Sequence, residues 1–219
     1  MKIKKAVLSS ILSQGMLPLF FYEDAVVSLE IVRTLYNAGI RAIEYTNRGK
    51  EALDNFKAIK KAVNREMPGL YLGIGTIKNV SDAEAFIDAG ADFIVAPIVN
   101  PEVGKVTNKH KLLWIPGCMT PTEIYLAQKN GADLIKIFPA NVVGPGFISS
   151  IRELFPGQLF MPTGGVELEA KNISGWFHAG ACAVGMGSKL ISKKIMDKRQ
   201  YDQLHEDTVK AIGLVKAAM

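Results

Sequence analysis

Cysteine and histidine are scarce in this sequence, and their scarcity argues against several classes of protein. The two cysteines, Cys118 and Cys182, have no paired spacing, so they do not suggest a disulfide framework and fit a reducing cytoplasm. The three histidines, His110, His178 and His205, all fall in predicted helices or at their ends and not at the ends of strands. We therefore expect neither a metal ion nor another cofactor.

Long apolar runs and linkers are also missing. No apolar run is long enough to cross a bilayer, and residues 1–15 lack the continuous apolar core and the cleavage site of a signal peptide. No low-complexity stretch interrupts the 219 residues. We expect a single domain over 1–219 that resides in the cytoplasm and has neither a membrane nor a nucleic acid as its partner.

The charge of the chain favours a small anionic substrate. The formal net charge is +5, from 26 Lys and Arg against 21 Asp and Glu. The lysines are scattered over several predicted helices with acidic residues among them, which is typical of solvated helix faces. A moderate positive excess attracts small anions more readily than it forms a nucleic-acid surface.

What is present is a regular alternation of short apolar runs with amphipathic segments. This rhythm predicts βα units and a parallel sheet. The candidate strands are 16–22, 42–46, 71–76, 93–97, 112–117, 134–139, 159–165 and 181–187. Eight strands that are each followed by a helix favour an α/β fold of the (β/α)8 TIM-barrel type over a doubly wound open sheet. We expect a further helix over residues 2–14, before the first strand.

Several helix ends are marked in the sequence. Thr120 and Glu123 have the spacing of a capping box, with proline at the first turn. Four glycines follow helical patterns and are expected to end those helices: Gly39, Gly90, Gly131 and Gly180.

A lysine and a glutamate interrupt two otherwise apolar strands. Lys136 lies in "LIKIFP", where a buried ammonium needs a partner or loses its proton and becomes a nucleophile. Glu44 lies in "AIEYT". In an eight-stranded ring these strands lie on opposite sides, so the two groups could face each other across the mouth. Two interpretations remain at this point, a buried ion pair or a catalytic pair around a small substrate.

Glycines at the ends of the last two strands predict a phosphate site. "PTGGV" supplies Gly164 and Gly165, and "VGMGS" supplies Gly187 and Ser188. Glycine lets backbone amides approach an anion, and the following helix N-terminus adds unpaired donors. The loops after strands seven and eight are the usual position of phosphate in such barrels.

Other strand ends offer groups that could bind or enclose a carboxylate. Thr76 ends the strand "GIGT", and Arg48 follows the strand that contains Glu44. The planar guanidinium of arginine suits a carboxylate. Pro97 ends its strand and could shape the wall of a pocket.

Five motifs in this order, "IEYTNR", "GIGT", "KIFPA", "PTGGV" and "VGMGS", resemble the 2-keto-3-deoxy-6-phosphogluconate aldolases, also called 4-hydroxy-2-oxoglutarate aldolases. The resemblance implies a class I aldolase, a lyase that works as a homotrimer of (β/α)8 barrels in the Entner-Doudoroff pathway. It implies that Lys136 forms a Schiff base with pyruvate and that Glu44 is the acid/base. It implies these binding residues: Arg48 and Thr76 for the pyruvate carboxylate, Pro97 and Phe138 for the pyruvate wall, and Gly164, Gly165, Gly187 and Ser188 for phosphate.

The implied reaction cleaves 2-dehydro-3-deoxy-6-phosphogluconate to pyruvate and D-glyceraldehyde 3-phosphate, and 4-hydroxy-2-oxoglutarate to pyruvate and glyoxylate. Two alternatives stay open: the galactonate-derived epimer as the substrate, or a phosphosugar-binding barrel without turnover. The sequence also departs from the family. Where many relatives have an arginine at the end of the first strand, this chain has Phe20, Phe21 and Tyr22.

Overall fold

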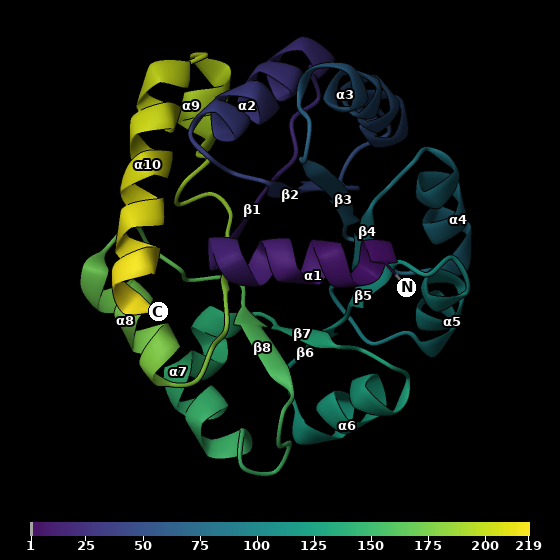
Figure 1. The fold of residues 1–219 in the computed structure, drawn as a ribbon, viewed down its shortest axis with the longest axis vertical. Coiled ribbons are helices and arrows are strands. Elements are labelled where there is room, and N and C mark those ends of the chain that lie inside the picture. Colours follow the sequence, from purple (N-terminus) through teal and green to yellow (C-terminus); the bar gives the residue numbers. More distant parts are fainter. Residues whose placement is uncertain (1) are drawn as a thin grey trace.

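The computed structural model describes residues 2–219 and shows an α/β fold in which helices surround parallel strands (Figure 1). The strands are β1 (Met16–Phe20), β2 (Ala42–Thr46), β3 (Tyr71–Gly75), β4 (Phe93–Val95), β5 (Leu113–Ile115), β6 (Gly117–Cys118), β7 (Leu134–Ile137), β8 (Leu159–Pro162) and β9 (Val184–Met186). The helices are α1 (Lys2–Gln14), α2 (Ala25–Asn37), α3 (Ala52–Glu66), α4 (Val80–Asp88), α5 (Pro101–Lys109), α6 (Pro121–Lys129), α7 (Ala140–Ile151), α8 (Ala170–His178), α9 (Lys193–Asp197) and α10 (Tyr201–Ala218). Helix α7 is interrupted at Gly144, whose backbone is not helical.

The strands form two parallel sheets. Six strands in the order β5-β4-β3-β2-β1-β9 form a half-barrel, and β6-β7-β8 form the second sheet. An isolated bridge between Thr163, which follows β8, and Gly185 of β9 connects the two sheets. The predicted α/β class with parallel strands is therefore confirmed. The predicted closed barrel is shown only in part, because residues 2–219 do not form one continuous hydrogen-bonded ring of strands.

Pro116 explains why the strand predicted at 112–117 divides into β5 and β6. Proline has no backbone N–H, so it cannot donate a hydrogen bond to a neighbouring strand. Before it, β5 pairs with β4, and after it, β6 pairs with β7. The Pro116 carbonyl accepts a 2.9 Å hydrogen bond from the backbone N–H of Lys136. The chain thus passes from one sheet to the other at this proline.

Helix α1 lies across the strands in Figure 1 and confirms the helix predicted over 2–14. Its Val7 and Ile11 are fully buried. They belong to an apolar cluster whose other buried members lie on or next to the strands: Leu17, Ala42, Phe93, Val95, Leu113, Ile115, Leu134, Met161 and Ala183. Helix α1 therefore closes one end of the strand assembly by burying apolar surface.

Gln14, the last residue of α1, ties this helix to the first strands. Its side-chain oxygen accepts hydrogen bonds from the backbone N–H groups of Arg41 (2.6 Å) and Ala42 (3.2 Å). Its amide donates to the carbonyls of Met16 (2.6 Å) and Ala42 (3.1 Å). One side chain thus satisfies backbone groups at the amino ends of β1 and β2.

A larger apolar cluster includes residues of the strands and of the helices around them. Phe56 of α3 and Phe86 of α4 meet edge to face in it, with ring centroids 5.4 Å apart. The predicted helix ends are confirmed. Thr120 and Glu123 form the capping box of α6. The terminating glycines all have positive φ angles, 107° at Gly39, 92° at Gly90, 81° at Gly131 and 107° at Gly180.

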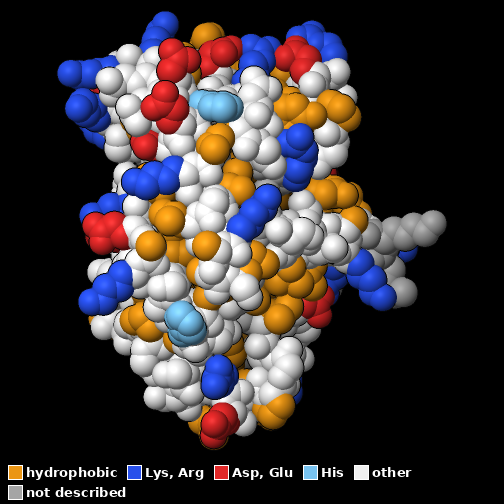
Figure 2. All heavy atoms as spheres, turned by 60° about the vertical axis from the view of Figure 1, so that its left-hand side comes forward, with side chains coloured by type: hydrophobic (Ala, Val, Ile, Leu, Met, Phe, Trp, Pro, Cys, Tyr) orange, Lys and Arg blue, Asp and Glu red, His pale blue; other side chains and the backbone are white. Residues whose placement is uncertain are grey.

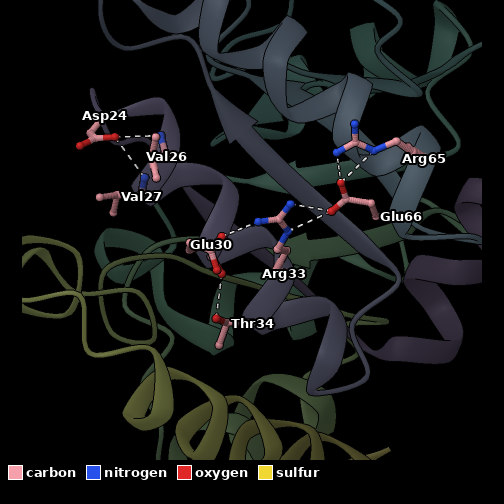
Figure 3. Close-up of polar contacts among 8 residues, drawn as sticks. All are labelled: Asp24, Val26, Val27, Glu30, Arg33, Thr34, Arg65 and Glu66. Atoms are coloured by element: carbon pink, nitrogen blue, oxygen red, sulfur yellow. Dashed lines mark hydrogen bonds and ion pairs between the residues drawn. The ribbon is translucent and has the colours of Figure 1, made fainter.

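Charged side chains connect α2 to α3 at the surface (Figure 3). Arg33 donates hydrogen bonds to Glu66 at 2.6 and 3.1 Å and to Glu30 at 2.5 Å. Arg65 contacts Glu66 from the other side. Asp24 caps α2 by accepting hydrogen bonds from two backbone N–H groups of its first turn. Such exposed ion pairs contribute little to stability, so apolar packing between the two helices contributes more to it.

The surface is mixed in character. Figure 2 shows the face that lies at the left of Figure 1, where Lys and Arg side chains are interspersed with acidic and apolar ones. This agrees with the scattered lysines of the sequence. Within residues 2–219, no helix is both long and apolar enough to span a membrane.

Candidate active site

Lys136 occupies the centre of the smaller sheet. It lies on β7, where its backbone is paired with Gly117 of β6 and Met161 of β8. The residue is only 4% exposed, and Nζ lies 4.9 Å from the centroid of the Phe138 ring. Burial lowers the pKa of the Lys136 ammonium; the charge of Glu44 opposes this effect and that of Arg48 adds to it. The neutral amine is therefore more populated at a given pH than in an exposed lysine.

Glu44 is the second buried ionisable group and lies on β2. Its backbone is paired with Leu19 of β1 and Gly73 of β3, and the residue is 1% exposed. The carboxylate lies beside Gly75, since a methyl group there would overlap Oε1. Burial raises the pKa of Glu44, and the positive charges of Lys136 and Arg48 oppose that rise. Among residues 2–219, Oε2 has no hydrogen-bond partner.

Lys136 and Glu44 influence each other without forming a direct ion pair. Within the described part of the chain, neither has a salt bridge with an N···O distance of 4.0 Å or less. Each charge nevertheless shifts the pKa of the other group. The geometry therefore does not support the interpretation of these residues as a purely structural ion pair.

Thr76 and Arg48 follow the neighbouring strands β3 and β2. The backbone N–H of Asn47 donates to the carbonyl of Gly75 at 2.9 Å and so fixes the two strand ends together. Thr76 is half-buried and has a φ of 65°, a region that a β-branched residue rarely adopts. Arg48 is exposed, so its guanidinium is accessible to a ligand. Both residues lie at the carboxyl ends of adjacent strands, as predicted.

Pro97 and Phe138 lie near Lys136 in different ways. The ring of Phe138 contacts the Lys136 amine. Pro97 follows β4, and its carbonyl packs closely on Gly117, where a methyl group would lie 2.5 Å from the oxygen. Gly117 is the β6 partner of Lys136. Gly117 thus lies between the backbone of Pro97 and Lys136, and its lack of a side chain permits this close packing.

A cavity of about 230 Å³ opens beside these residues. Its lining residues come from the ends of β1, β7, β8 and β9, from the loops after β2 and β9, and from α9: Leu19, Phe20, Phe21, Arg48, Phe138, Thr163, Gly164, Gly165, Val166, Gly185, Gly187, Ser188, Lys189, Ile191 and Met196. Among them are the four residues predicted to bind phosphate, together with Arg48 and Phe138. Lys136, Glu44, Thr76 and Pro97 do not line this cavity; Lys136 adjoins it through the ring of Phe138.

The loop after β8 requires its glycines. Gly164 and Gly165 have φ angles of 95° and 73°, which glycine adopts without strain. A methyl group on Gly165 would also lie 2.6 Å from the Cβ of Asn141. Gly187 and Ser188 border the same cavity from the end of β9, and Ser188 is exposed. The predicted phosphate residues therefore lie together.

Two of the polar side chains that line the cavity, those of Thr163 and Lys189, were not among the predicted site residues. Thr163 is buried, and its hydroxyl has no hydrogen-bond partner among residues 2–219. Its position, a hydroxyl directly after an apolar strand, is the feature of the sequence that could have identified it. Lys189 follows Ser188 directly and reaches the same cavity, but nothing in its sequence context distinguishes it from the solvated lysines nearby.

The cysteines and histidines lie elsewhere. Burial raises the pKa of both thiols, Cys118 and Cys182, to about 12, so neither is an accessible thiolate near neutral pH. His110 caps the end of α5, His178 ends α8, and His205 lies on α10. Within residues 2–219, no group of three or more His, Cys, Asp or Glu side chains is arranged to hold a metal ion.

Comparison with known proteins connects this geometry to one family. The family model described as KDPG and KHG aldolase matches residues 8–206. A probable 2-dehydro-3-deoxy-6-phosphogalactonate aldolase of Rhizobium meliloti (strain 1021) is 33% identical over 73% of this chain and 74% of its own length. A 2-dehydro-3-deoxy-phosphogluconate aldolase of Treponema pallidum (strain Nichols) is 32% identical over 88% and 90%.

A solved structure has the same fold over nearly the full chain. It is the 2-keto-3-deoxy-6-phosphogluconate aldolase of Zymomonas mobilis ZM4 with 3-phosphoglycerate. It superposes with a TM-score of 0.84 at 25% identity and covers 99% of each chain.

Proposed function

Because the chain belongs to the KDPG and KHG aldolase family, we propose that it cleaves a 2-keto-3-deoxy acid by class I chemistry at Lys136. The chain is a lyase of the aldolase type. The observation that carries the proposal is a buried lysine with a lowered pKa and no ion pair within residues 2–219, close enough to a buried glutamate for each to affect the other. These are the properties of an amine that attacks a carbonyl.

The first half of the reaction forms the Schiff base. The lone pair of the neutral Lys136 amine attacks the C2 ketone of the substrate and gives a carbinolamine. Protonation of its hydroxyl by Glu44 and loss of water leave an iminium between Nζ and C2. The raised pKa of Glu44 suits this step, because the carboxyl group can hold a proton at a higher pH than an exposed glutamate.

The second half breaks the bond between C3 and C4. The Glu44 carboxylate takes the proton of the C4 hydroxyl, the C3–C4 electron pair moves into the iminium, and an aldehyde leaves. The remaining enamine takes a proton at C3, and water then hydrolyses the iminium to release pyruvate and the free amine. In this proposal Arg48 and Thr76 bind the pyruvate carboxylate, and Phe138 and Pro97 enclose its methyl side.

The distal end of the substrate is assigned to the cavity. Backbone amides of Gly164, Gly165 and Gly187 and the hydroxyl of Ser188 bind the phosphate and hold the reacting bond in place. We propose 2-dehydro-3-deoxy-6-phosphogluconate as the substrate, cleaved to pyruvate and D-glyceraldehyde 3-phosphate, with 4-hydroxy-2-oxoglutarate cleaved to pyruvate and glyoxylate as a second activity. The galactonate epimer is the alternative, because the Rhizobium relative carries that name. Membership of an enzyme family argues against a barrel without turnover.

We also propose a single domain in which the two sheets act as one eight-stranded barrel. The bridge from Thr163 to Gly185 and the passage of the chain through Pro116 connect the sheets on both sides. A homotrimer in the cytoplasm, acting in Entner-Doudoroff metabolism, completes the proposal and rests on the family resemblance. Light scattering on the purified chain should give the mass of three copies, and the mass of one copy would contradict the trimer.

The proposal is tested by Lys136→Arg. Arginine is similar in length but stays protonated and lacks a primary amine, so it cannot form the imine. Pyruvate release from 2-dehydro-3-deoxy-6-phosphogluconate should fall to less than about a hundredth of the wild-type rate, as for an essential nucleophile. Lys129→Arg, at an exposed position on α6, is the matched control and should retain full activity. A Lys136→Arg enzyme that keeps its rate would remove the Schiff base from the mechanism.

A further inference from the structure

Among the described residues that line the cavity, Arg48 and Lys189 are cationic and none is acidic. The side formed by β1 and its end is apolar, since it contributes Leu19, Phe20 and Phe21. A phosphate bound there would receive no charged partner from β1. Any side-chain cation for it must come from another part of the lining.

The two cations lie in different parts of the chain. Arg48 follows β2, beside the strand end that carries Thr76. Lys189 directly follows Gly187 and Ser188, which the proposed function assigns to the phosphate. Lys189 is therefore the cation that comes from the phosphate end of the cavity.

Lys189 has a counter-ion that the loop after β8 holds in place. Its Nζ lies 2.9 Å from Oε1 of Glu167, and the two side chains are 56% and 39% exposed. Asn172 of α8 accepts a hydrogen bond from the backbone N–H of Glu167 at 3.0 Å and donates one to the carbonyl of Gly165 at 3.1 Å. The same asparagine thus fixes both the phosphate glycine and the residue that bears the carboxylate.

Building on the proposed function, we propose that Lys189 binds the phosphate group of the substrate and that Glu167 competes with this phosphate for the lysine. An ion pair this exposed contributes little to stability, so a phosphate with its several acceptor oxygens can displace the carboxylate. The displaced carboxylate remains near the dianion and repels it. Lys189 strengthens binding of phosphorylated substrates, and Glu167 limits that binding and favours release of the phosphorylated product.

The proposal predicts changes of opposite sign for the two partners. Lys189→Met should raise the Michaelis constant for 2-dehydro-3-deoxy-6-phosphogluconate roughly fivefold or more, since a charged contact to phosphate is lost. Glu167→Gln should lower the same constant about twofold, because the repulsion disappears. Neither variant should change the constant for 4-hydroxy-2-oxoglutarate, which has no phosphate. Lys194→Met removes the same charge from an exposed position on α9 and should have no effect on either substrate.

Binding of inorganic phosphate, measured by calorimetry, tests the proposal without turnover. The affinity should fall in Lys189→Met, rise in Glu167→Gln and stay unchanged in Lys194→Met, with melting temperatures used to confirm folding. Equal weakening in Lys189→Met and Lys194→Met would reduce the effect to net charge and overturn the proposal. Equal changes for both substrates would also overturn it. Borohydride trapping of pyruvate at Lys136 should be the same in all three variants, so its failure would concern the proposed function alone.

Discussion

Lys136 and Glu44 make opposite demands on pH. The folded-state pKa of Glu44 is raised, so its contribution to stability is complete below its unfolded pKa and is lost as pH rises through the folded value. The folded-state pKa of Lys136 is lowered, so its contribution is present above its unfolded pKa and is lost as pH falls through the folded value. Burial thus disfavours the charged form of both groups. Burial of these two groups therefore lowers stability, and in the proposed mechanism both groups react.

Glu44→Gln tests the role of Glu44 in turnover and its effect on stability. The amide cannot transfer protons as the carboxyl group does, so turnover should fall roughly a hundredfold or more. The same change removes a carboxyl group whose ionised form is disfavoured by burial, so the melting temperature should rise more at high pH than at low pH. Steady-state kinetics and thermal unfolding provide the two readouts. Glu84→Gln, at an exposed position on α4, should alter neither; an unchanged turnover number in Glu44→Gln would remove Glu44 from the mechanism.

Thr76 is a second residue held in place at the expense of stability. A β-branched residue at a φ of 65° carries strain of about 1 to 3 kcal/mol, which glycine would not have. Thr76→Gly should therefore raise the free energy of unfolding by about 1 kcal/mol, after subtracting the larger entropy of the unfolded glycine. It should also weaken pyruvate binding, while Thr76→Ser, which keeps the hydroxyl, should retain most of it. Denaturant unfolding and pyruvate inhibition measure these effects, and a less stable Thr76→Gly protein would contradict the strain argument.

Among the helices and strands, the sequence predicted those features that neighbouring residues determine. The capping box of Thr120 and the helix over 2–14 are set by neighbouring residues, and both are confirmed. The strands predicted at 16–22 and 159–165 end earlier, at Phe20 and Pro162. Apolar periodicity reports burial, and the chain remains partly buried after the strand hydrogen bonds stop. The sequence showed Pro116 as part of a strand, but which strand pairs on each side of it depends on distant residues.

The apolar periodicity of the sequence also did not predict the role of Gln14, which joins α1 to the strands. Gln14→Ala removes four hydrogen bonds and leaves the N–H groups of Arg41 and Ala42 without their side-chain acceptor. The free energy of unfolding should fall by about 1 to 3 kcal/mol, the range for partly buried donors left unpaired. Turnover should change little, because Gln14 lies at the amino ends of the strands and the site at their carboxyl ends. Gln203→Ala on the exposed side of α10 is the control for a lost glutamine. Equal stability of wild type and Gln14→Ala would contradict the assigned role of α1.

In the molecule as a whole, the parallel arrangement of the strands allowed the position of the candidate site to be predicted from separate segments. Because the carboxyl ends of parallel strands meet at one edge, the sequence predicted Glu44, Lys136, Gly165 and Gly187 to lie in one region. The same reasoning could not find Lys189. Lys50 and Lys78 also lie a few residues after strands, and only the folded chain shows that Lys189 lines the cavity.

The proposed mechanism depends on a covalent imine between Lys136 and pyruvate, which borohydride trapping can detect. The intact protein is incubated with pyruvate, reduced with borohydride, and measured by mass spectrometry before and after digestion. We predict one reduced pyruvyl group per chain, located on Lys136 and missing from Lys136→Ala. A wild-type protein without the adduct, or an adduct that persists in Lys136→Ala, would show that Lys136 does not form the imine.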